Sequence, residues 1–435
     1  MILAFVVGYL AIALEHVLKI NKAAIALMMA GIIWTAYSFI DPISVLPKIT
    51  AQMGDVCSII FFLLGAMTIV ELVDVHGGFA FVTHFIRAKS KKKLLWLITV
   101  ITFFMSAVLD NMTTTIIMIA VMSKLIEDNR DRLWFASLIV VAANGGGAWS
   151  PIGDVTTIML WVKGNVTSLG IIKHLFLASM VSVLIPAFLI SLKLKGTIVH
   201  PNSPDALEIG EKLYPYVTRT DKVIITAIGV GGLVCVPLFK TLTGLPPFMG
   251  VTIVLALLWF ITEVIYSKRR DLKEGCKLRI SKVIHYIDSP TIFFFFGILL
   301  AVSALQEGGL LTAMSDYLNK TFNDVYLITG IIGVLSSVID NVPLVAAAMG
   351  MYPLADASTL QAGAYMLNFV QNGTFWELLA YCAGVGGSLL IIGSAAGVVA
   401  MGAEHISFVW YLKHITPRVF IGYIAGILVY MLMYM

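Results

Sequence analysis

The stretch SAVLDNMTTTIIM, residues 106–118, places an aspartate, an asparagine and three threonines inside an otherwise apolar segment. A second stretch, SSVIDNVPLVAAA at 336–348, repeats its Ser-x-x-apolar-Asp-Asn pattern, so that Asp110 and Asp340 occupy equivalent positions. A charged aspartate at the centre of a membrane costs about 2.5 to 3.5 kcal/mol on insertion scales, and such residues are therefore functional by default. The first question is whether these segments lie in a membrane.

The composition answers that question. Only 12% of the 435 residues are charged and 59% are hydrophobic, with a mean hydropathy of +0.94, whereas soluble domains are about a quarter charged. We therefore predict an all-α polytopic membrane protein whose main partner is the lipid bilayer, with no nucleic-acid partner. The first apolar run lacks the features of a cleaved signal and is expected to remain as a transmembrane helix. The four cysteines form no CxxC pair, and HExxH and GxxxxGK[ST] do not occur, so we expect neither an enzyme nor a cofactor nor an ATP-driven pump.

Apolar runs of two kinds are present. Eight are simple and long enough for about 30 Å of hydrocarbon: residues 2–18, 23–40, 56–75, 171–192, 222–239, 247–266, 291–306 and 418–434. Four are interrupted by polar residues, glycine or proline: residues 94–122, 133–161, 325–352 and 374–403.

The distribution of basic residues orients these segments. We treat the two Asp-Asn regions as re-entrant hairpins and the other two interrupted regions as full spans with broken middles. The positive-inside rule then makes one side cytoplasmic and places both termini outside. All but five of the 29 Lys and Arg residues fall on this side, the exceptions being Lys48, Lys163, Lys173, Lys240 and Lys320.

Three segments recur in the same order in both halves of the chain. FFLLGAMTIVELVDVHGG (61–78) resembles FFFFGILLAVSALQEGG (293–309), the two Asp-Asn motifs match, and GGGAWSPIGD (145–154) resembles VGGSLLIIGS (385–394). On the topology above the copies are inverted, and inverted repeats with interrupted helices are typical of secondary transporters. Each repeat would contain a re-entrant hairpin and a broken transmembrane helix. The expected parts are N-terminal scaffold helices (1–54), the first repeat (55–192), a cytoplasmic linker (193–221), scaffold helices with a basic loop (222–286), the second repeat (287–403) and a C-terminal helix (404–435).

The glycine-rich regions allow two interpretations. Three glycines at about 1 kcal/mol each and a proline at about 3 kcal/mol predict that the helix breaks between Asn144 and Gly153. The glycines could instead let neighbouring helices pack closely.

Asp110, Asp154 and Asp340 are the candidate ligands of a transported Na+ or Li+, the only metal expected. As N-caps alone they could be replaced by Asn or Ser without the cost of a charge, although capping does not exclude ion binding. Removal from water favours the protonated carboxyl group, so protons and cations would compete for it, which is sufficient for antiport. Glu71 and Asp74 lie late in a span and are candidates for a proton pathway or for the membrane interface. Oxygen ligands could come from Asn111, Thr113, Thr114, Asn144, Thr156, Thr157, Ser336, Asn341, Ser388 and Ser394.

Five ordered motifs together resemble the NhaD-type sodium/proton antiporters of the ion transporter superfamily, over about residues 55–403: FFLLGAMTIVELVD, SAVLDNMTTTIIM, NGGGAWSPIGDVTT, SSVIDNVPL and IIGSAAGVVAMG. The resemblance implies exchange of cytoplasmic Na+ or Li+ for external H+ in a bacterial-type inner membrane, and a homodimer with a scaffold and a mobile transport domain. The functional polar positions implied by the family are Asp110, Asn111, Asn144, Asp154, Thr156, Thr157, Ser336, Asp340 and Asn341.

A sodium-coupled carboxylate or oxyanion symporter of the same superfamily is the alternative. Related carboxylate carriers have a Ser-Asn-Thr tip where this chain has Asp-Asn. A carboxylate at the tip would repel an anionic substrate and attract a cation, which favours cation exchange.

Overall fold

The computed structural model describes residues 1–13, 15–80, 88, 90–194, 196, 217–269, 272, 277–322, 324–359 and 365–434. All regular secondary structure in these residues is helical. Most of the predicted linker, residues 197–216, and part of the predicted basic loop, residues 273–276, lie outside the described residues.

Long apolar helices match seven of the eight simple runs. Within the described residues, seven helices are long and apolar enough to cross a membrane, as expected of a polytopic membrane protein. They are α3 (Lys22–Ile40), α4 (Val45–Val75), α10 (Ser168–Ser191), α12 (Arg219–Thr243), α13 (Pro247–Ser267), α15 (Ser289–Glu307) and α22 (Thr416–Tyr434).

The first apolar run is described as two helical segments, α1 (Ile2–Ala13) and α2 (Glu15–Leu18). Residue 14, between them, lies outside the described residues. The chain then turns at Lys19, whose φ of 56° is left-handed, and the Glu15 carboxylate accepts a hydrogen bond from the Lys22 backbone N–H at 3.1 Å. The predicted span over 2–18 includes residue 14 and stays a prediction, and the turn at Lys19 agrees with its predicted end.

Each of the four interrupted regions contains two helices separated by a break. In all four, the second helix begins directly after a residue that the sequence singled out, namely Asp110, Asp154, Asp340 or Ser394. The pairs are α6 (Lys91–Ser106) with α7 (Asn111–Leu125), α8 (Asn129–Ala148) with α9 (Val155–Val162), α17 (Val325–Leu335) with α18 (Asn341–Met351), and α19 (Thr374–Gly386) with α20 (Ala395–Glu404).

The glycine-rich helix breaks within the predicted segment 144–153, in its second part. Gly145, Gly146 and Gly147 are the last turn of α8, and the chain leaves the helix only at 149–154. A Cβ added to Gly146 would lie 2.2 Å from the Phe103 carbonyl oxygen on α6. Gly146 therefore allows α6 and α8 to approach closely, which agrees with the packing interpretation.

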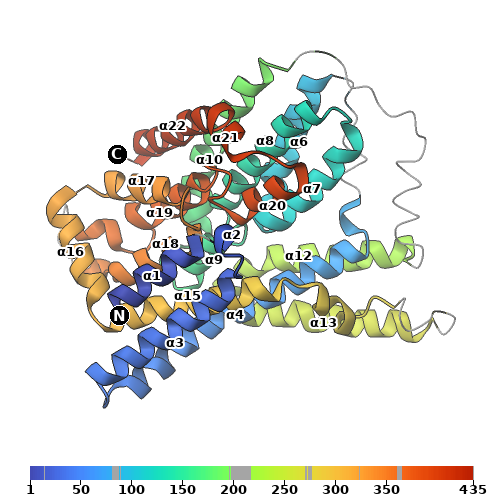
Figure 1. Cartoon of the computed structure of the whole chain (residues 1–435). Helices are drawn as coiled ribbons and strands as arrows, with labels where there is room; N and C mark the ends of the chain where they lie inside the picture. Colours follow the sequence, from blue (N-terminus) through green and yellow to red (C-terminus); the bar gives the residue numbers. More distant parts are fainter. Residues whose placement is uncertain are drawn as a thin grey trace.

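The helices form two groups (Figure 1). One contains α3, α4, α12, α13 and α15, and the other contains α6–α8, α10, α17, α19, α20 and α22. Helices of the two halves interleave, since α3 packs on α15 and α4 on α13. Helix α9 contacts α4 and α19, and α18 contacts α15 and α19, so both link the groups. Shorter elements are α14 (Ile280–Val283), α16 (Leu310–Phe322), α21 (Phe408–His414) and the 3-10 turns η1 (Gly78–Ala80), η3 (Ile284–Tyr286), η4 (Ala357–Thr359) and η5 (Tyr365–Phe369).

Candidate functional site

Asp154 lies at the point where the two halves of the chain meet. It caps α9, and its Oδ1 accepts hydrogen bonds from the Thr156 backbone N–H and hydroxyl, both at 2.8 Å. Its Oδ2 accepts from Asn111 Nδ2 at 2.6 Å, and Asn341 Nδ2 lies 3.4 Å from each carboxylate oxygen. Asp154 is only 1% exposed. The asparagines of both Asp-Asn motifs thus point at one buried carboxylate.

Asn144 extends this arrangement to the second broken helix. Its Oδ1 accepts from Asn111 Nδ2 at 3.0 Å, and its own Nδ2 donates to the hydroxyls of Ser388 at 2.8 Å and Ser394 at 2.9 Å. The two serines, predicted only as further candidate ligands, therefore lie in the same network. We call this set the polar cluster; its members are all buried and are Asn111, Asn144, Asp154, Thr156, Asn341, Ser388 and Ser394.

The other two aspartates have separate partners. Asp110 caps α7 and accepts from the Thr113 backbone N–H at 2.8 Å and hydroxyl at 2.6 Å. Asp340 caps α18 through the Val342 N–H at 3.2 Å and also pairs with Lys22 Nζ at 2.8 Å. Capping is therefore part of the role of both.

The three aspartates are near one another without forming one ligand set. The negative charges of Asp110 and Asp340 lie close enough to Asp154 to repel its carboxylate electrostatically. Among the residues that the structure describes, however, no three His, Cys, Asp or Glu side chains lie close enough to hold one metal ion. In this conformation Asp154 alone supplies a carboxylate to the polar cluster.

Two predicted threonines border the cluster. The Thr157 hydroxyl donates to the Asp154 backbone carbonyl at 2.8 Å. The Thr114 hydroxyl, one helical turn after Asn111, is buried and has no hydrogen-bond partner in the described part of the chain. An unsatisfied buried hydroxyl needs an explanation, and an ion or water held beside it would provide one.

The remaining predicted residues lie elsewhere. The Ser336 hydroxyl donates to the Ala383 carbonyl at 2.9 Å, a contact between α19 and the break that follows α17. Glu71 and Asp74 are half-buried in the last turns of α4, a helix that contributes no residue to the polar cluster. Their predicted part in a proton pathway stays a prediction.

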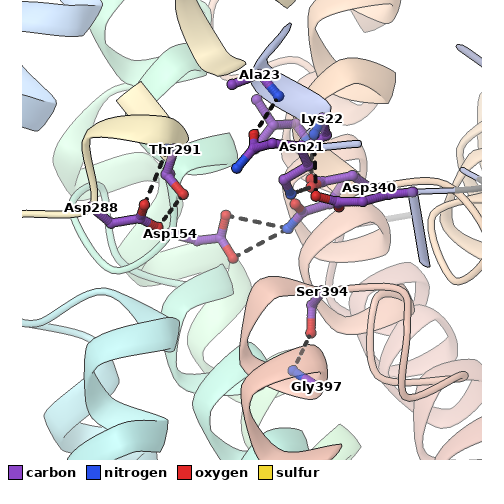
Figure 2. Close-up of polar contacts among 12 residues, drawn as sticks. Asn21, Lys22, Ala23, Asp154, Asp288, Thr291, Asp340, Ser394 and Gly397 are labelled. Atoms are coloured by element: carbon purple, nitrogen blue, oxygen red, sulfur yellow. Dashed lines mark hydrogen bonds and ion pairs between the residues drawn. The ribbon is translucent and has the colours of Figure 1, made fainter. Parts of the chain in front are cut away.

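A cavity of about 300 Å³ adjoins the cluster. Its lining comes from α1, α3, α15, α18 and α20 and includes Tyr9, Lys22, Asp288, Asp340 and Ser394. Figure 2 shows Lys22 beside Asp340, and Ser394 with its hydroxyl directed toward Gly397. Ser394 belongs to both the lining and the cluster, so the cavity reaches the buried site.

The sequence analysis did not predict two contacts between charged or titratable side chains. Lys22 counted only as a loop charge, because its partner Asp340 is 318 residues away in the sequence. The second contact is centred on Glu377, which is 1% exposed, accepts from the Tyr430 hydroxyl at 2.7 Å and lies 2.7 Å from His174 Nδ1. A signal was available for Glu377, which is a lone acid within the apolar segment TFWELLAYC at 374–382.

The cluster has the chemistry of an exchange site. Its carboxylate can hold a proton or a hard cation, and amide and hydroxyl oxygens are the ligands that such cations accept. The polar cluster contains side chains from both halves of the chain. Movement of α9 relative to α18 would therefore change how an ion reaches the cluster. The same residues contain no thiolate or imidazole that would favour a softer metal.

Known proteins resemble this chain along almost all of its length. The model of the citrate transporter family matches residues 9–370. Sodium/proton antiporter 2 of Arabidopsis thaliana is 42% identical over 99% of this chain and 98% of its own length. Sodium/proton antiporter 1 of the same plant is 43% identical, over 99% of this chain and 72% of its own length. The Na+/H+ antiporter NhaD of Vibrio cholerae is 30% identical, over 99% and 91%.

Proposed function

The chain belongs to the citrate transporter family and, within it, to the NhaD-type sodium/proton antiporters, and on this premise we propose that it exchanges cytoplasmic Na+ or Li+ for external H+. It is a transporter and not an enzyme. Asp154 would bind the cation and the proton in turn. The observation that carries this assignment is the convergence of Asn111 and Asn341, one from each half, on a carboxylate that is 1% exposed.

The proposed cycle depends on the charge of Asp154. The amide N–H groups of Asn111 and Asn341 face the carboxylate. Rotation of each side-chain amide would present its oxygen to an arriving cation. The unpaired Thr114 hydroxyl would add a further oxygen. Either ligand neutralises the carboxylate, whereas a bare charge is costly to move through the membrane.

We propose two inverted repeats, each with a re-entrant hairpin and a broken helix. Equivalent contacts in the two halves support the repeat. Ser106 donates to the Ala143 carbonyl at 2.6 Å, as Ser336 does to the Ala383 carbonyl. The two helical groups in Figure 1 would be the scaffold and the mobile transport domain. The homodimer and the inner-membrane location stay predictions.

The pairing of surface charges supports the proposed topology, with both termini outside. Residues expected on the cytoplasmic side pair with one another, and so do those expected outside. The first set is Lys91–Asp131, Arg132–Glu404, Arg269–Asp221 and Arg279–Glu263, and the second is Lys48–Asp41, Lys48–Glu307 and Lys163–Asp55. Because Lys22 and Asp288 belong to the cytoplasmic side, the cavity would open inward, and the conformation would be the one that loads Na+.

The family description keeps carboxylate transport as the competing function. An anionic substrate at this site would meet the Asp154 carboxylate within the cluster and Asp340 in the adjoining cavity. Like charges at such distances in a poorly solvated site repel strongly. Cation exchange therefore fits the site better than uptake of citrate.

The deciding experiment uses inside-out vesicles with an imposed pH gradient, acid inside. Addition of Na+ or Li+ should collapse the gradient in vesicles that carry the wild-type protein. Vesicles with Asp154→Asn should not respond, and those with Asp128→Asn should respond normally, because Asp128 caps α8 in an exposed position outside the cluster.

Labelled citrate tests the alternative in the same vesicles. Sodium-dependent citrate uptake without any response of the pH gradient, at neutral and alkaline pH, would overturn the antiporter assignment. A normal response in Asp154→Asn vesicles would leave the function intact and remove Asp154 from it.

A further inference from the structure

Lys22 holds an unusual position for a residue at a helix start. It is the first residue of α3, and its ammonium lies 2.8 Å from Asp340 Oδ2 and 4.4 Å from the ring centre of Phe294. The Lys22 side chain is 26% exposed and that of Asp340 is 17% exposed. A cation is therefore already bound to Asp340, and it belongs to the protein.

The surroundings of this ammonium are acidic. Three carboxylates that line the cavity attract the Lys22 ammonium: those of Asp340, Glu15 and Asp288. One lysine does not balance three carboxylates, so the cavity still attracts cations from water. A lysine has a flexible four-carbon stem, and Glu15 or Asp288 could receive the ammonium if it left Asp340.

Tyr9 supplies the second independent observation. Its hydroxyl oxygen is buried and has no hydrogen-bond partner within the described portion of the chain. The ring lines the same cavity, and the hydroxyl is within electrostatic range of Asp340. A neutral oxygen of this kind, in a cavity that Asp340 also lines, can serve as a ligand for a small hard cation.

Building on the proposed function, we propose that Lys22 is a tethered competitor of the transported cation at Asp340, and that the Tyr9 hydroxyl is a ligand of the ion that replaces it. Na+ entering the cavity would bind Asp340 only by displacing the ammonium. The displaced ammonium would move toward Glu15 or Asp288, and Na+ would gain the Tyr9 oxygen on its way to the polar cluster. Lys22 therefore sets the Na+ concentration that the exchanger needs.

A second ion pair shows what a fixed structural contact looks like in this protein. Arg132 donates from Nε and Nη2 to the two oxygens of Glu404, at 2.7 and 2.6 Å, and Glu404 is 5% exposed. Such a two-point contact is directional and rigid. Lys22 makes one contact to one oxygen of Asp340, in a cavity, as expected of a group that leaves and returns.

The test measures the half-maximal Na+ concentration for collapse of the pH gradient in inside-out vesicles. Lys22→Met should lower it about tenfold, which corresponds to about 1.4 kcal/mol of lost competition. Tyr9→Phe, which removes only the hydroxyl, should raise it several-fold. Lys48→Met is the matched control, since Lys48 pairs with Asp41 and Glu307 away from the cavity, and its value should equal that of the wild type.

Lys22→Arg provides a second, charged variant and should keep a half-maximal Na+ concentration near that of the wild type or above it. An unchanged value in Lys22→Met, with wild-type exchange intact, would overturn the role of Lys22 alone; absence of exchange in the wild type would instead overturn the proposed function. If Lys22→Met does not accumulate in membranes, Lys22→Gln replaces it. Loss of all exchange in a neutral variant present at wild-type levels would also overturn the proposal, because exchange does not require a competitor.

Discussion

The breaks between α8 and α9 and between α19 and α20 both contain a glycine in close contact with a neighbouring backbone. The residues that follow these glycines have different side chains. A Cβ added to Gly153 would meet the Ser106 carbonyl oxygen at 2.5 Å, and one added to Gly393 would meet that of Ser337 at 2.6 Å. The next residue caps the following helix in each case, Asp154 through Thr156 and Ser394 through Gly397.

Asp154 and Ser394 share a structural role, helix capping, but differ in chemistry. Both residues satisfy the N–H groups at the start of a helix, for which Ser and Asp serve about equally well. Asp154 alone brings a charge, and the serine hydroxyl accepts a hydrogen bond from Asn144 instead. The polar cluster therefore contains one carboxylate rather than two.

The largest expected effect comes from making the two breaks alike. Asp154→Ser copies the second break into the first and should reduce Na+-dependent proton flux at least a hundredfold, because no carboxylate then remains in the cluster. Adding Ser394→Asp to it restores a carboxylate at the equivalent position. This double variant should stay below a tenth of the wild-type rate, because Asn111 and Thr156 donate at position 154.

Flux in inside-out vesicles, normalised to protein in the membrane, measures both variants. Ser394→Ala is the control for loss of the native hydroxyl and should retain exchange with a raised half-maximal Na+ concentration. Near-normal flux in the double variant would mean that the two breaks are interchangeable, which would break the comparison.

An intermediate effect is expected from the two motif asparagines. Asn111 lies 2.6 Å from the carboxylate and also contacts Asn144, whereas Asn341 lies at 3.4 Å. A hydrogen bond to a charged group contributes about 1.5 to 3 kcal/mol. Asn111→Ala should therefore slow exchange roughly ten- to a hundredfold, and Asn341→Ala less than tenfold.

Initial exchange rates of the two variants at saturating Na+, each divided by the wild-type rate, measure the two losses directly. Equal losses in the two variants would indicate that the site is symmetric during the cycle, even though it is asymmetric in this conformation. A larger loss in Asn341→Ala would reverse the assignment of the nearer asparagine.

The smallest effect should come from Ser106 and Ser336, whose hydroxyls make the same contact in the two halves. Loss of one such hydrogen bond costs about 0.5 to 1.5 kcal/mol. Ser106→Ala and Ser336→Ala should therefore lower the free energy of unfolding in detergent by equal amounts of about 1 kcal/mol. A raised half-maximal Na+ concentration in Ser336→Ala only would show that the ion-binding role predicted for Ser336 exceeds its packing role.

Local sequence signals predicted much of the site. The Asp-Asn motifs and the glycine-rich segments marked all four breaks, because capping residues and glycines act within one or two helical turns. The glycine-rich helix breaks in the second part of the predicted segment, because Gly145 to Gly147 stay helical and Gly146 serves the packing of α8 on α6.

Contacts between distant residues could not be predicted from one sequence. Nothing near Lys22 indicates that it would pair with Asp340, and nothing near Ser388 indicates that it would reach Asn144. Such contacts depend on the packing of α3 on α15 and of α8 on α19. The residues were identified by type, but their partners required the folded molecule.

The interleaving of the two halves has a consequence for how the protein is made. Helix α3 packs on α15, and Lys22 pairs with a residue synthesised 318 positions later. At about 5 to 20 residues per second, this interval lasts roughly 15 to 60 s. Throughout it the first half resides in the bilayer without its partner helix, and Lys22 without Asp340. Insertion and folding of this chain are therefore separate events, and the nascent first half depends on the lipid and the insertion machinery to keep it in place until the second half arrives.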